Sequence, residues 1–380
     1  MKGSYIIGTE GQYLYKFKVG DIEDAILEEE LQLFTLIEEA GNVLPTFQLI
    51  FNTLREDIFQ VLHEGQILET TFGRNSNALV TAPLSPTRMQ TGKSGEFKRQ
   101  IILTGVYGAL DYLSSSKMMI TTEKSGVAAV KDVVSKHFKP IFNVDVSQDK
   151  QKWIQPQQTD KKFVNEVWLH SYIEGSFIAC GISSDGKFIL KDIKKDLKQP
   201  YAWKFTNDIK DPNKDLTYDP DPFIETNTGF INNFTGYGRE RIVYNLEDDD
   251  QLSVLETVDP VIAMTKQLAK SDAVSKRFAA SGMQNENVHS NYWKAYHRNM
   301  SHLTAFGNVK LTLSFHGVFI PIRVLDQVMF LDDDITSQGK SRSSEFNSGV
   351  YYVAKVSRTI ANRQFVTTVV LCRESLNQIR

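Results

Sequence analysis

The segment from Gly349 to Gln378 carries the pattern that most restricts the fold of this chain. β-branched and aromatic residues alternate with other residues along both arms, GVYYVAKVSRT and QFVTTVVLCR, and Asn362 between them suits a turn. This pattern predicts a β-hairpin. A lone hairpin is marginally stable in water, so we expect it to close a larger barrel. The residues expected in the barrel core or at an interface are Val353, Val356, Phe365, Val369 and Leu371.

The composition is that of a globular protein without a strong charge signal. The chain has 380 residues, of which 41% are hydrophobic and 23% charged, so two or more domains are expected. The formal net charge of −3 indicates no basic field for nucleic-acid binding. The N-terminal residues lack a secretion signal, and no apolar run is long enough for a membrane span. Cys180 and Cys372 lie in apolar contexts typical of buried thiols in a reducing compartment.

Alternating segments predict that both ends of the chain are rich in β-structure. The segment 32–37 contains good helix formers, but its alternation and the following Pro45 favour a strand. The segment 55–62 is predicted as a short helix or an extended arm, and 90–95 as a polar loop. The predicted strands are 13–19, 32–37, 46–51, one that begins within 63–70, 77–86, 98–106, 309–315, 319–324, 327–331 and the terminal hairpin.

The periodicity changes in the middle of the chain. Helical spacing is found at 108–113, 125–138 and 159–169, where Thr159 is a good N-cap, and Asp185-Gly186 predicts the turn of a hairpin at 175–190. Further along, 211–238 reads as an irregular loop, and helices are predicted at 259–278 and 291–302.

We therefore expect a mainly β protein with an α+β insert, built from two barrel-like tube domains and a small α+β domain. The expected domains are 1–106, the first barrel-like domain, 107–200, the insert, and 201–380, the second barrel-like domain with an irregular and helical insertion at about 211–305. The segments HEGQILETTFG (63–73) and RVLDQVMFLDD (323–333) share a pattern, as do 94–108 and 344–359. This likeness of pattern is weak evidence for an internal duplication.

The candidate catalytic and metal-binding residues do not form known motifs. His289, His297 and His302 lie near Glu286 but lack metal-ligand spacing, and the acidic residues at 219, 221, 248–250 and 332–334 lack the form of a calcium loop. His63-Glu64 has no nucleophile nearby, and 114–116 lacks a nucleophile elbow. We therefore predict that the chain is not an enzyme and has no catalytic residues, no metal and no cofactor.

The C-terminal region and a middle stretch resemble phage tail hub proteins, also called baseplate central hubs. In residues 287–330 a helix leads into a strand and then a tight corner, as in the family. Residues 348–375 resemble the two strands that end the family's hub. Ser348-Gly349 and Tyr352-Val353 match its Ser-Gly-x-Tyr-x-Val strand, and 367–373 match its x-Thr-x-Leu-x-Leu-x-Arg strand. Leu325 stands where the family usually has Gly. The stretch 153–193 resembles the family's middle helix and hairpin. The family is related to the N-terminal hub part of type VI secretion spike proteins.

The resemblance implies a structural virion protein located in the phage tail and assembled in the bacterial cytoplasm. Such a hub is a homotrimer with two barrels per chain, so it joins a six-fold tail tube to a three-fold central spike and forms part of the tail channel. Its implied partners are itself, a tail tube or distal tail ring protein, a separate spike or tip protein and a tape-measure protein, with DNA only as passing cargo. The pattern turns polar after Leu371, so we expect the spike to be a separate chain.

The resemblance also implies arms that reach toward a neighbouring tube ring. The polar loops 87–95 and 332–347 are predicted to be equivalent arms of the two halves, and their basic residues are Arg88, Lys93, Lys340 and Arg342. Two alternatives stay open. The first is a tail-associated peptidoglycan hydrolase, and the second is a receptor- or sugar-binding tail protein in which Trp153, Trp203 and Trp293 stack on sugars.

Overall fold

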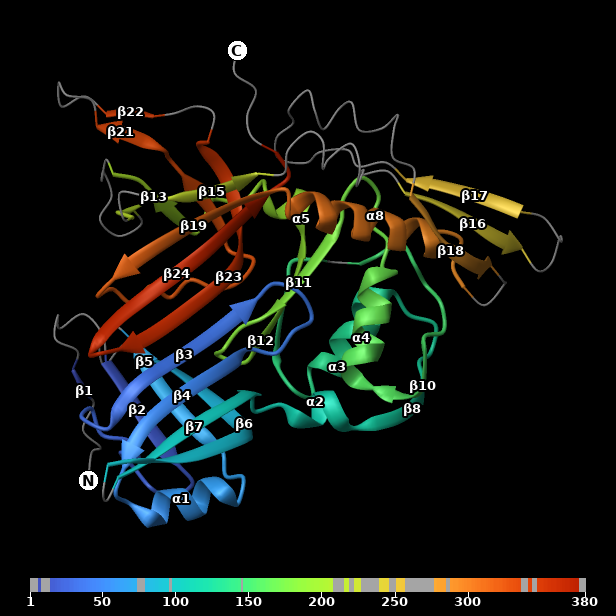
Figure 1. The fold of residues 1–380 in the computed structure, drawn as a ribbon. Coiled ribbons are helices and arrows are strands. Elements are labelled where there is room, and N and C mark those ends of the chain that lie inside the picture. The colour runs from blue at the N-terminus through green and yellow to red at the C-terminus, as the bar shows by residue number, and fades with distance from the viewer. Residues whose placement is uncertain are drawn as a thin grey trace.

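The computed structural model describes residues 6–7, 14–73, 79–95, 98–144, 146–207, 215–218, 222–226, 239–245, 251–256, 277–284, 288–335, 341–343 and 347–375. Within these residues one 14-stranded sheet runs through both the N-terminal and the C-terminal parts of the chain (Figure 1). A group of helices and short strands lies beside it and comes from the middle of the sequence. The chain is thus mainly β with an α+β insert, as the sequence predicted.

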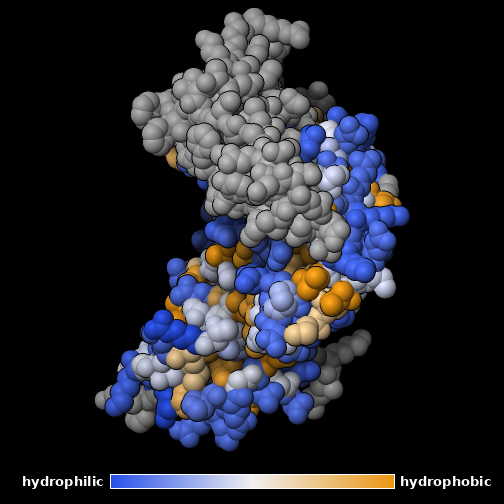
Figure 2. All heavy atoms as spheres, turned by 90° about the vertical axis from the view of Figure 1, so that its right-hand side faces the viewer, coloured by the Kyte–Doolittle hydropathy of each residue, from blue (hydrophilic) through white to orange (hydrophobic). Residues whose placement is uncertain are grey.

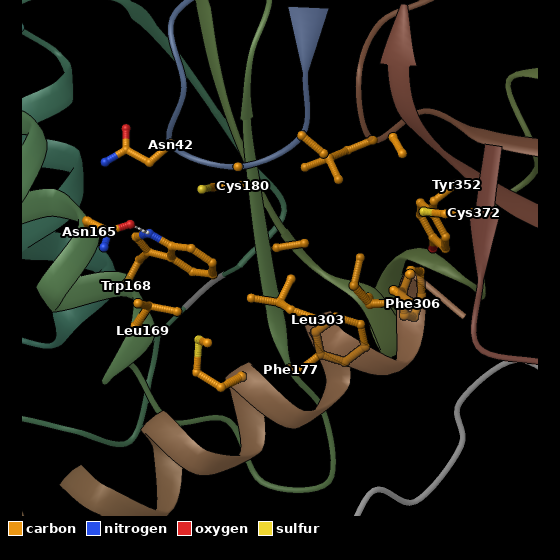
Figure 3. A pocket seen from close by; sticks show the side chains of 18 of the residues that line it. Asn42, Asn165, Trp168, Leu169, Phe177, Cys180, Leu303, Phe306, Tyr352 and Cys372 are labelled. Atoms are coloured by element: carbon orange, nitrogen blue, oxygen red, sulfur yellow. Dashed lines mark hydrogen bonds between the residues drawn. The ribbon is translucent and has the colours of Figure 1, made fainter. Parts of the chain in front are cut away.

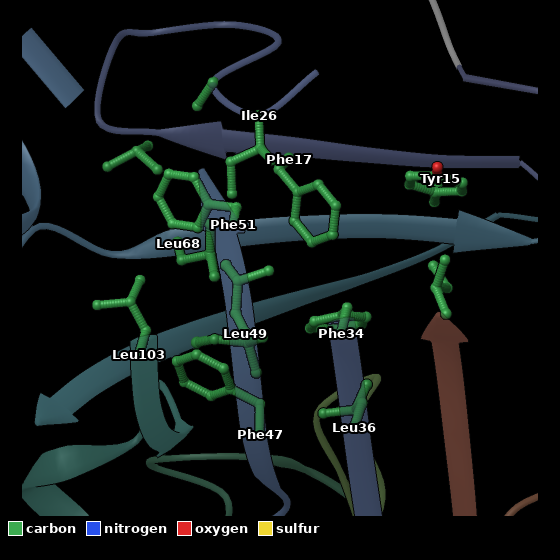
Figure 4. Packing of buried hydrophobic residues seen from close by; sticks show 14 of the residues in the cluster. Tyr15, Phe17, Ile26, Phe34, Leu36, Phe47, Leu49, Phe51, Leu68 and Leu103 are labelled. Atoms are coloured by element: carbon green, nitrogen blue, oxygen red, sulfur yellow. The ribbon is translucent and has the colours of Figure 1, made fainter. Parts of the chain in front are cut away.

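The first barrel-like half surrounds an apolar core to which each strand contributes alternate side chains (Figure 4). In β2 (Leu14–Val19), Tyr15 and Phe17 are buried, and the lysines beside them take the other face. α1 (Glu56–His63) covers one end of this core with Ile58 and Leu62. The remaining strands are β1 (Ile6–Ile7), β3 (Leu31–Glu39), β4 (Thr46–Thr53), β5 (Leu68–Gly73), β6 (Leu79–Ser94) and β7 (Lys98–Tyr107).

The second barrel-like half has its own core, in which Leu311, Leu313 and Val328 are fully or almost fully buried. Its strands are β13 (Trp203–Phe205), β14 (Asp215–Leu216), β15 (Phe223–Thr226), β19 (Val309–His316), β20 (Gln327–Phe330), β23 (Gly349–Ala361) and β24 (Gln364–Arg373). α8 (Tyr292–Phe306) precedes β19, and the short pair β21 (Asp333–Ile335) and β22 (Ser341–Ser343) follows β20. A separate three-stranded sheet contains β16 (Arg239–Asn245), β17 (Gln251–Glu256) and β18 (Arg277–Gln284).

Five strands in each half pair in the same order. The order is β3-β4-β7-β6-β5 in the first half and β15-β19-β24-β23-β20 in the second, and every adjacent pair is antiparallel. The chain also visits the matching strands in the same sequence. This topology supports an internal duplication and matches β5 with β20, as the patterns predicted. However, the topology makes β7 the equivalent of β24, so the predicted correspondence of 94–108 with 344–359 is wrong.

The insert packs helices and short strands around a core of its own. α3 (Gly126–Val134) buries its valines, and α4 (Asp160–Leu169) begins at Thr159, whose hydroxyl accepts a hydrogen bond from the Lys162 N–H. Both predicted helices are confirmed, as is the hairpin with its turn at Gly186, where φ is 75°. The other elements are α2 (Leu110–Ser114), β8 (Ser116–Ile120), β9 (Lys139–Phe142), β10 (Ile154–Thr159), β11 (Ile178–Ile182), β12 (Lys187–Asp192) and α5 (Ile193–Asp196).

Two local predictions are wrong, and a third is mostly untested. The segment 319–324 is not a strand: Phe319 packs in the first core and Ile320 and Ile322 pack in the second, but the segment joins no ladder. The segment 90–95 is not a loop, since β6 continues to Ser94. The helix predicted at 259–278 lies mostly outside the described residues, and its last two residues belong to β18. In contrast, the strand at 32–37, the helix at 291–302 and the terminal hairpin are confirmed.

Candidate functional site

The seam between the two halves is formed by one strand, β23. One edge of β23 pairs with β24, while the other pairs with β20 through residues 349–352 and then with β3 through residues 355–361. The sheet therefore continues from the second half into the first (Figure 1). The terminal hairpin thus completes the second half and also holds the first half, a pairing that the sequence analysis did not predict.

A register shift within β23 sets which of its residues are buried. The shift lies between Val353 and Lys355, so Val353 and Val356 both face the second core although regular alternation would place them on opposite faces. Val369 and Leu371 on β24 face the same core, whereas Phe365 packs in the core of the first half. All five predicted hairpin residues are buried in the single chain. Their role in assembly stays a prediction.

A buried ion pair crosses this seam. The Arg358 guanidinium on β23 donates to Glu38 Oε1 on β3 at 2.8 Å, and the two side chains are 5% and 1% exposed. Arg358 also donates to the Ile322 carbonyl at 2.6 Å, and the Ser184 hydroxyl of the insert donates to the same Glu38 oxygen. One pair of charges therefore connects the first half, the insert, β23 and the segment before β20.

A second connection lies at the corner that follows β3. The Ala40 N–H donates to the Ala354 carbonyl and the Gly41 N–H to the Cys180 carbonyl, both at 2.7 Å. A Cβ on Gly181 would lie 2.7 Å from a methyl carbon of Val324, so glycine allows this close approach. The three parts of the chain therefore meet through backbone contacts as well as charges.

Asp185 links the insert to the second half. It accepts hydrogen bonds from Ser183 and Lys187 and from Arg323, whose guanidinium lies 3.0 Å away. Burial by itself would raise the pKa of Asp185, but these hydrogen bonds and the charge of Arg323 outweigh it and hold the pKa below its ordinary value. The carboxylate is therefore stabilised in its charged form at neutral pH.

The first predicted arm, 87–95, is a two-stranded ribbon. β6 and β7 pair as far as Ser94 and Lys98, and Gly95 turns the chain with φ at 83°. Arg88 and Lys93 are both exposed on this ribbon. The ribbon extends beyond the core, so residues on both of its faces are mostly polar. Because apolar residues do not alternate here, the sequence did not predict a strand.

The second predicted arm, 332–347, does not occupy the equivalent position. Arg342 lies in β22, and Lys340 lies outside the described residues. This segment connects β20 with β23, whereas the topological match of the β6–β7 turn is the Asn362–Arg363 turn between β23 and β24. The prediction that the two arms are equivalent is therefore wrong.

An apolar patch on the insert was missed. Met118 and Ile120 on β8 and Ile154 on β10 are 72%, 65% and 53% exposed, and Ile120 and Ile154 are cross-strand partners. Figure 2 views the side of the molecule that carries the insert and shows hydrophobic side chains at its surface. The alternation of Met118 and Ile120 in SKMMI was the signal available in the sequence. Exposed apolar patches are typical of contact sites.

The described histidines and acids that were considered for metal binding have other partners or positions. His297 and His302 are buried on α8, where His302 Nδ1 lies 3.3 Å from Glu374 Oε1, and His289 contacts the insert through the His170 carbonyl. Of the acidic run at 332–334, Asp332 accepts a hydrogen bond from Asn347. Glu286 and the acids at 219, 221 and 248–250 lie outside the described residues. Among the described residues, no three His, Cys, Asp or Glu side chains are grouped to hold a metal ion.

The residues of the two alternative functions are also dispersed. His63 and Glu64 are exposed at the end of α1 in the first half. Trp153 is buried in the core of the insert, whereas Trp203 lies in β13 and Trp293 in α8. Because Trp153 is buried, it is not available to stack on a sugar. In the part of the chain that the structure describes, no helix is long and apolar enough to cross a membrane.

Solved structures of known proteins share this fold. No protein-family model matches the chain, and no curated protein matches its sequence. Among solved structures, a tail protein from Neisseria meningitidis MC58 is similar with a TM-score of 0.59 at 14% identity, with 95% of this chain and 97% of that chain covered. The 43 kDa tail protein of prophage MuSo2 from Shewanella oneidensis is similar with a TM-score of 0.58 at 12% identity and coverage of 96% and 100%.

A third structure extends the likeness beyond phage tails. The E. coli c3393 protein, a component of the type VI secretion system described as structurally similar to the T4 tail proteins gp27 and gp5, gives a TM-score of 0.52 at 9% identity, with coverage of 96% and 79%. At these identities the likeness concerns the fold. The chain thus has the fold of phage tail proteins and of a type VI secretion component, the fold that the sequence resemblance implied.

Proposed function

We propose that this chain is the structural hub of a phage tail, a homotrimer that joins a six-fold tail tube to a three-fold central spike. One observation carries this proposal: the same order of five antiparallel strands occurs twice within one continuous sheet. Three copies of such a chain present six similar barrel-like units around one axis. A closed ring needs unlike surfaces on each chain that fit each other, and the two halves supply them.

The hub role specifies the partners and the location. The chain contacts two further copies of itself, a tail tube or distal tail ring protein, a spike or tip protein and a tape-measure protein. It lines part of the tail channel, through which DNA passes as cargo, and it is a non-enzymatic component of the virion that is assembled in the bacterial cytoplasm. The domains are 1–106, 107–200 and 201–380; the insertion expected at about 211–305 includes β14 and β15, which join the sheet of the second half.

We assign contact with the neighbouring tube ring to the β6–β7 ribbon. Its exposed Arg88 and Lys93 extend beyond the barrel core, so they are available to acidic groups of another chain. Arg342 and Lys340 belong to a different connection and take part in a separate contact. The five hairpin residues act indirectly, because they fix the shape of the surfaces that meet in the ring.

The test is deletion and complementation in the host that produces the tails. Without the chain, we expect no tails with an attached spike in electron micrographs. A variant with Arg88→Glu and Lys93→Glu should form trimers but fail to join the tube, while Lys150→Glu, at an exposed lysine of the insert, should assemble normally. Normal tails without the chain would contradict the hub role, and normal tails with the double variant would contradict only the ribbon contact.

A further inference from the structure

A cavity of about 630 Å³ lies where the first half, the insert and α8 meet. Figure 3 shows that the side chains around it come from segments far apart in the sequence, with Cys180 and Cys372 on opposite sides. Its volume lies within the range of about 300–1,000 Å³ that is typical of small-molecule sites. Its large apolar and aromatic lining residues include Trp168, Leu169, Phe177, Leu303, Phe306 and Tyr352.

The described lining residues carry positive charge only. Among the described residues that line the cavity, Lys310 is the one charged residue, and it is exposed to solvent. Lys310 forms no ion pair with a described residue, although Glu225 is its cross-strand neighbour on β15. The two lining amides have partners of their own: Asn42 bonds to Lys161 and Tyr112, and Asn165 accepts from Trp168.

We propose that this cavity binds an anionic amphiphile, with its aliphatic chain against the apolar lining and its carboxylate or phosphate at Lys310. Burial of the chain removes apolar surface of both ligand and protein from water. An anion is costly to bring to an apolar site unless a cation meets it, and Lys310 supplies that cation. A cationic amphiphile would be repelled by the same residue. This binding activity is separate from the hub role and does not depend on it.

The cysteines provide a direct report of occupancy. The chain has only two cysteines, Cys180 on β11 and Cys372 on β24, and both line the cavity. Burial raises the pKa of the Cys372 thiol to about 12, so its alkylation is slow and can be followed over hours. In a Cys180→Ala variant, Cys372 is the single thiol, and a ligand in the cavity shields it.

The experiment measures alkylation of Cys372 by iodoacetamide, with dodecyl probes kept below the concentration at which they form micelles. At ten times its dissociation constant, dodecanoate should slow the reaction about tenfold, because only unoccupied protein reacts. Dodecyltrimethylammonium at the same concentration should leave the rate unchanged. Dodecyl phosphate is the second anionic arm: tighter binding than dodecanoate indicates a phospholipid-type head group, and weaker binding indicates a free fatty acid.

Matched variants assign the two ends of the ligand. Lys310→Gln should weaken dodecanoate binding about tenfold, Lys310→Arg should retain it, and Lys150→Gln, at a residue that does not line the cavity, should have no effect. Met300→Trp, which adds volume to a lining side chain, should abolish protection while the circular dichroism spectrum stays unchanged. Equal binding of the cationic probe, or unchanged affinity in Lys310→Gln, would overturn the head-group assignment. Failure of both anionic probes to protect Cys372 would overturn the site itself.

Discussion

The ion pair between Glu38 and Arg358 should be the most sensitive polar contact of the seam. Replacing Arg358 with Leu leaves the Glu38 carboxylate, which is 1% exposed, with Ser184 as its remaining donor, and it also frees the Ile322 carbonyl. An uncompensated buried charge of this kind costs about 3–5 kcal/mol. We therefore expect Arg358→Leu to lower the free energy of unfolding by that amount in urea titrations followed by circular dichroism.

The chain offers a matched control on the same two strands. Lys355 and Glu39 form an ion pair at the same 2.8 Å, but their side chains are 39% and 48% exposed. Such an exposed pair contributes about 1 kcal/mol or less, so Lys355→Gln should have little effect. The double variant Glu38→Leu/Arg358→Leu removes both buried charges and should be more stable than Arg358→Leu alone. A loss of stability in Arg358→Leu no larger than in Lys355→Gln, or a double variant less stable than Arg358→Leu, would contradict this role of the buried pair.

Three further predictions concern single residues. Leu325 is buried but has φ at 65°, where a side chain costs about 1–2 kcal/mol, so Leu325→Gly should destabilise the chain by about 1 kcal/mol less than Leu325→Ala does; equal losses in thermal unfolding would contradict this. Arg363 has φ at 61° in the hairpin turn, so Arg363→Gly should stabilise the protein by about 0.5–1 kcal/mol. A melting temperature below that of the parent chain would count against this prediction. The pKa of Asp185 is lowered in the folded chain, so its contribution to stability is fully present above the unfolded-state pKa of about 3.9 and is lost as the pH falls through the lower folded-state pKa. Asp185→Asn should therefore lose less stability in acid than the parent chain. Parallel curves of stability against pH for the two proteins would disprove this role.

The sequence predicted those elements whose local pattern agrees with their final environment. The terminal hairpin and β3 alternate because one face of each is buried, and α4 begins where Thr159 can cap it. The segment 319–324 has the same alternation but packs without a ladder, and β6 continues as a strand beyond its apolar residues. Local periodicity reports burial, whereas ladder pairing depends on chain segments far away in the sequence.

The long-range features of the candidate site were beyond sequence reasoning for the same physical reason. The pairing of β23 with β3 joins residues more than 300 positions apart, and the register shift near Val353 changes which face of the strand is buried. The family resemblance correctly indicated the fold, and it drew attention to Leu325, whose φ is the kind that glycine adopts easily. The cavity near Lys310 has no sequence signature, because its lining residues come from all three parts of the chain.

The central claim is that the chain assembles into a three-fold ring with six barrel-like units. Electron-microscopy class averages of the purified protein, together with its mass by sedimentation, test this claim most directly. We expect a particle of three 43.1 kDa chains, seen end-on as a ring of six lobes around a channel. A monomer both in solution and in the assembled tail, or a particle without three-fold symmetry, would contradict it.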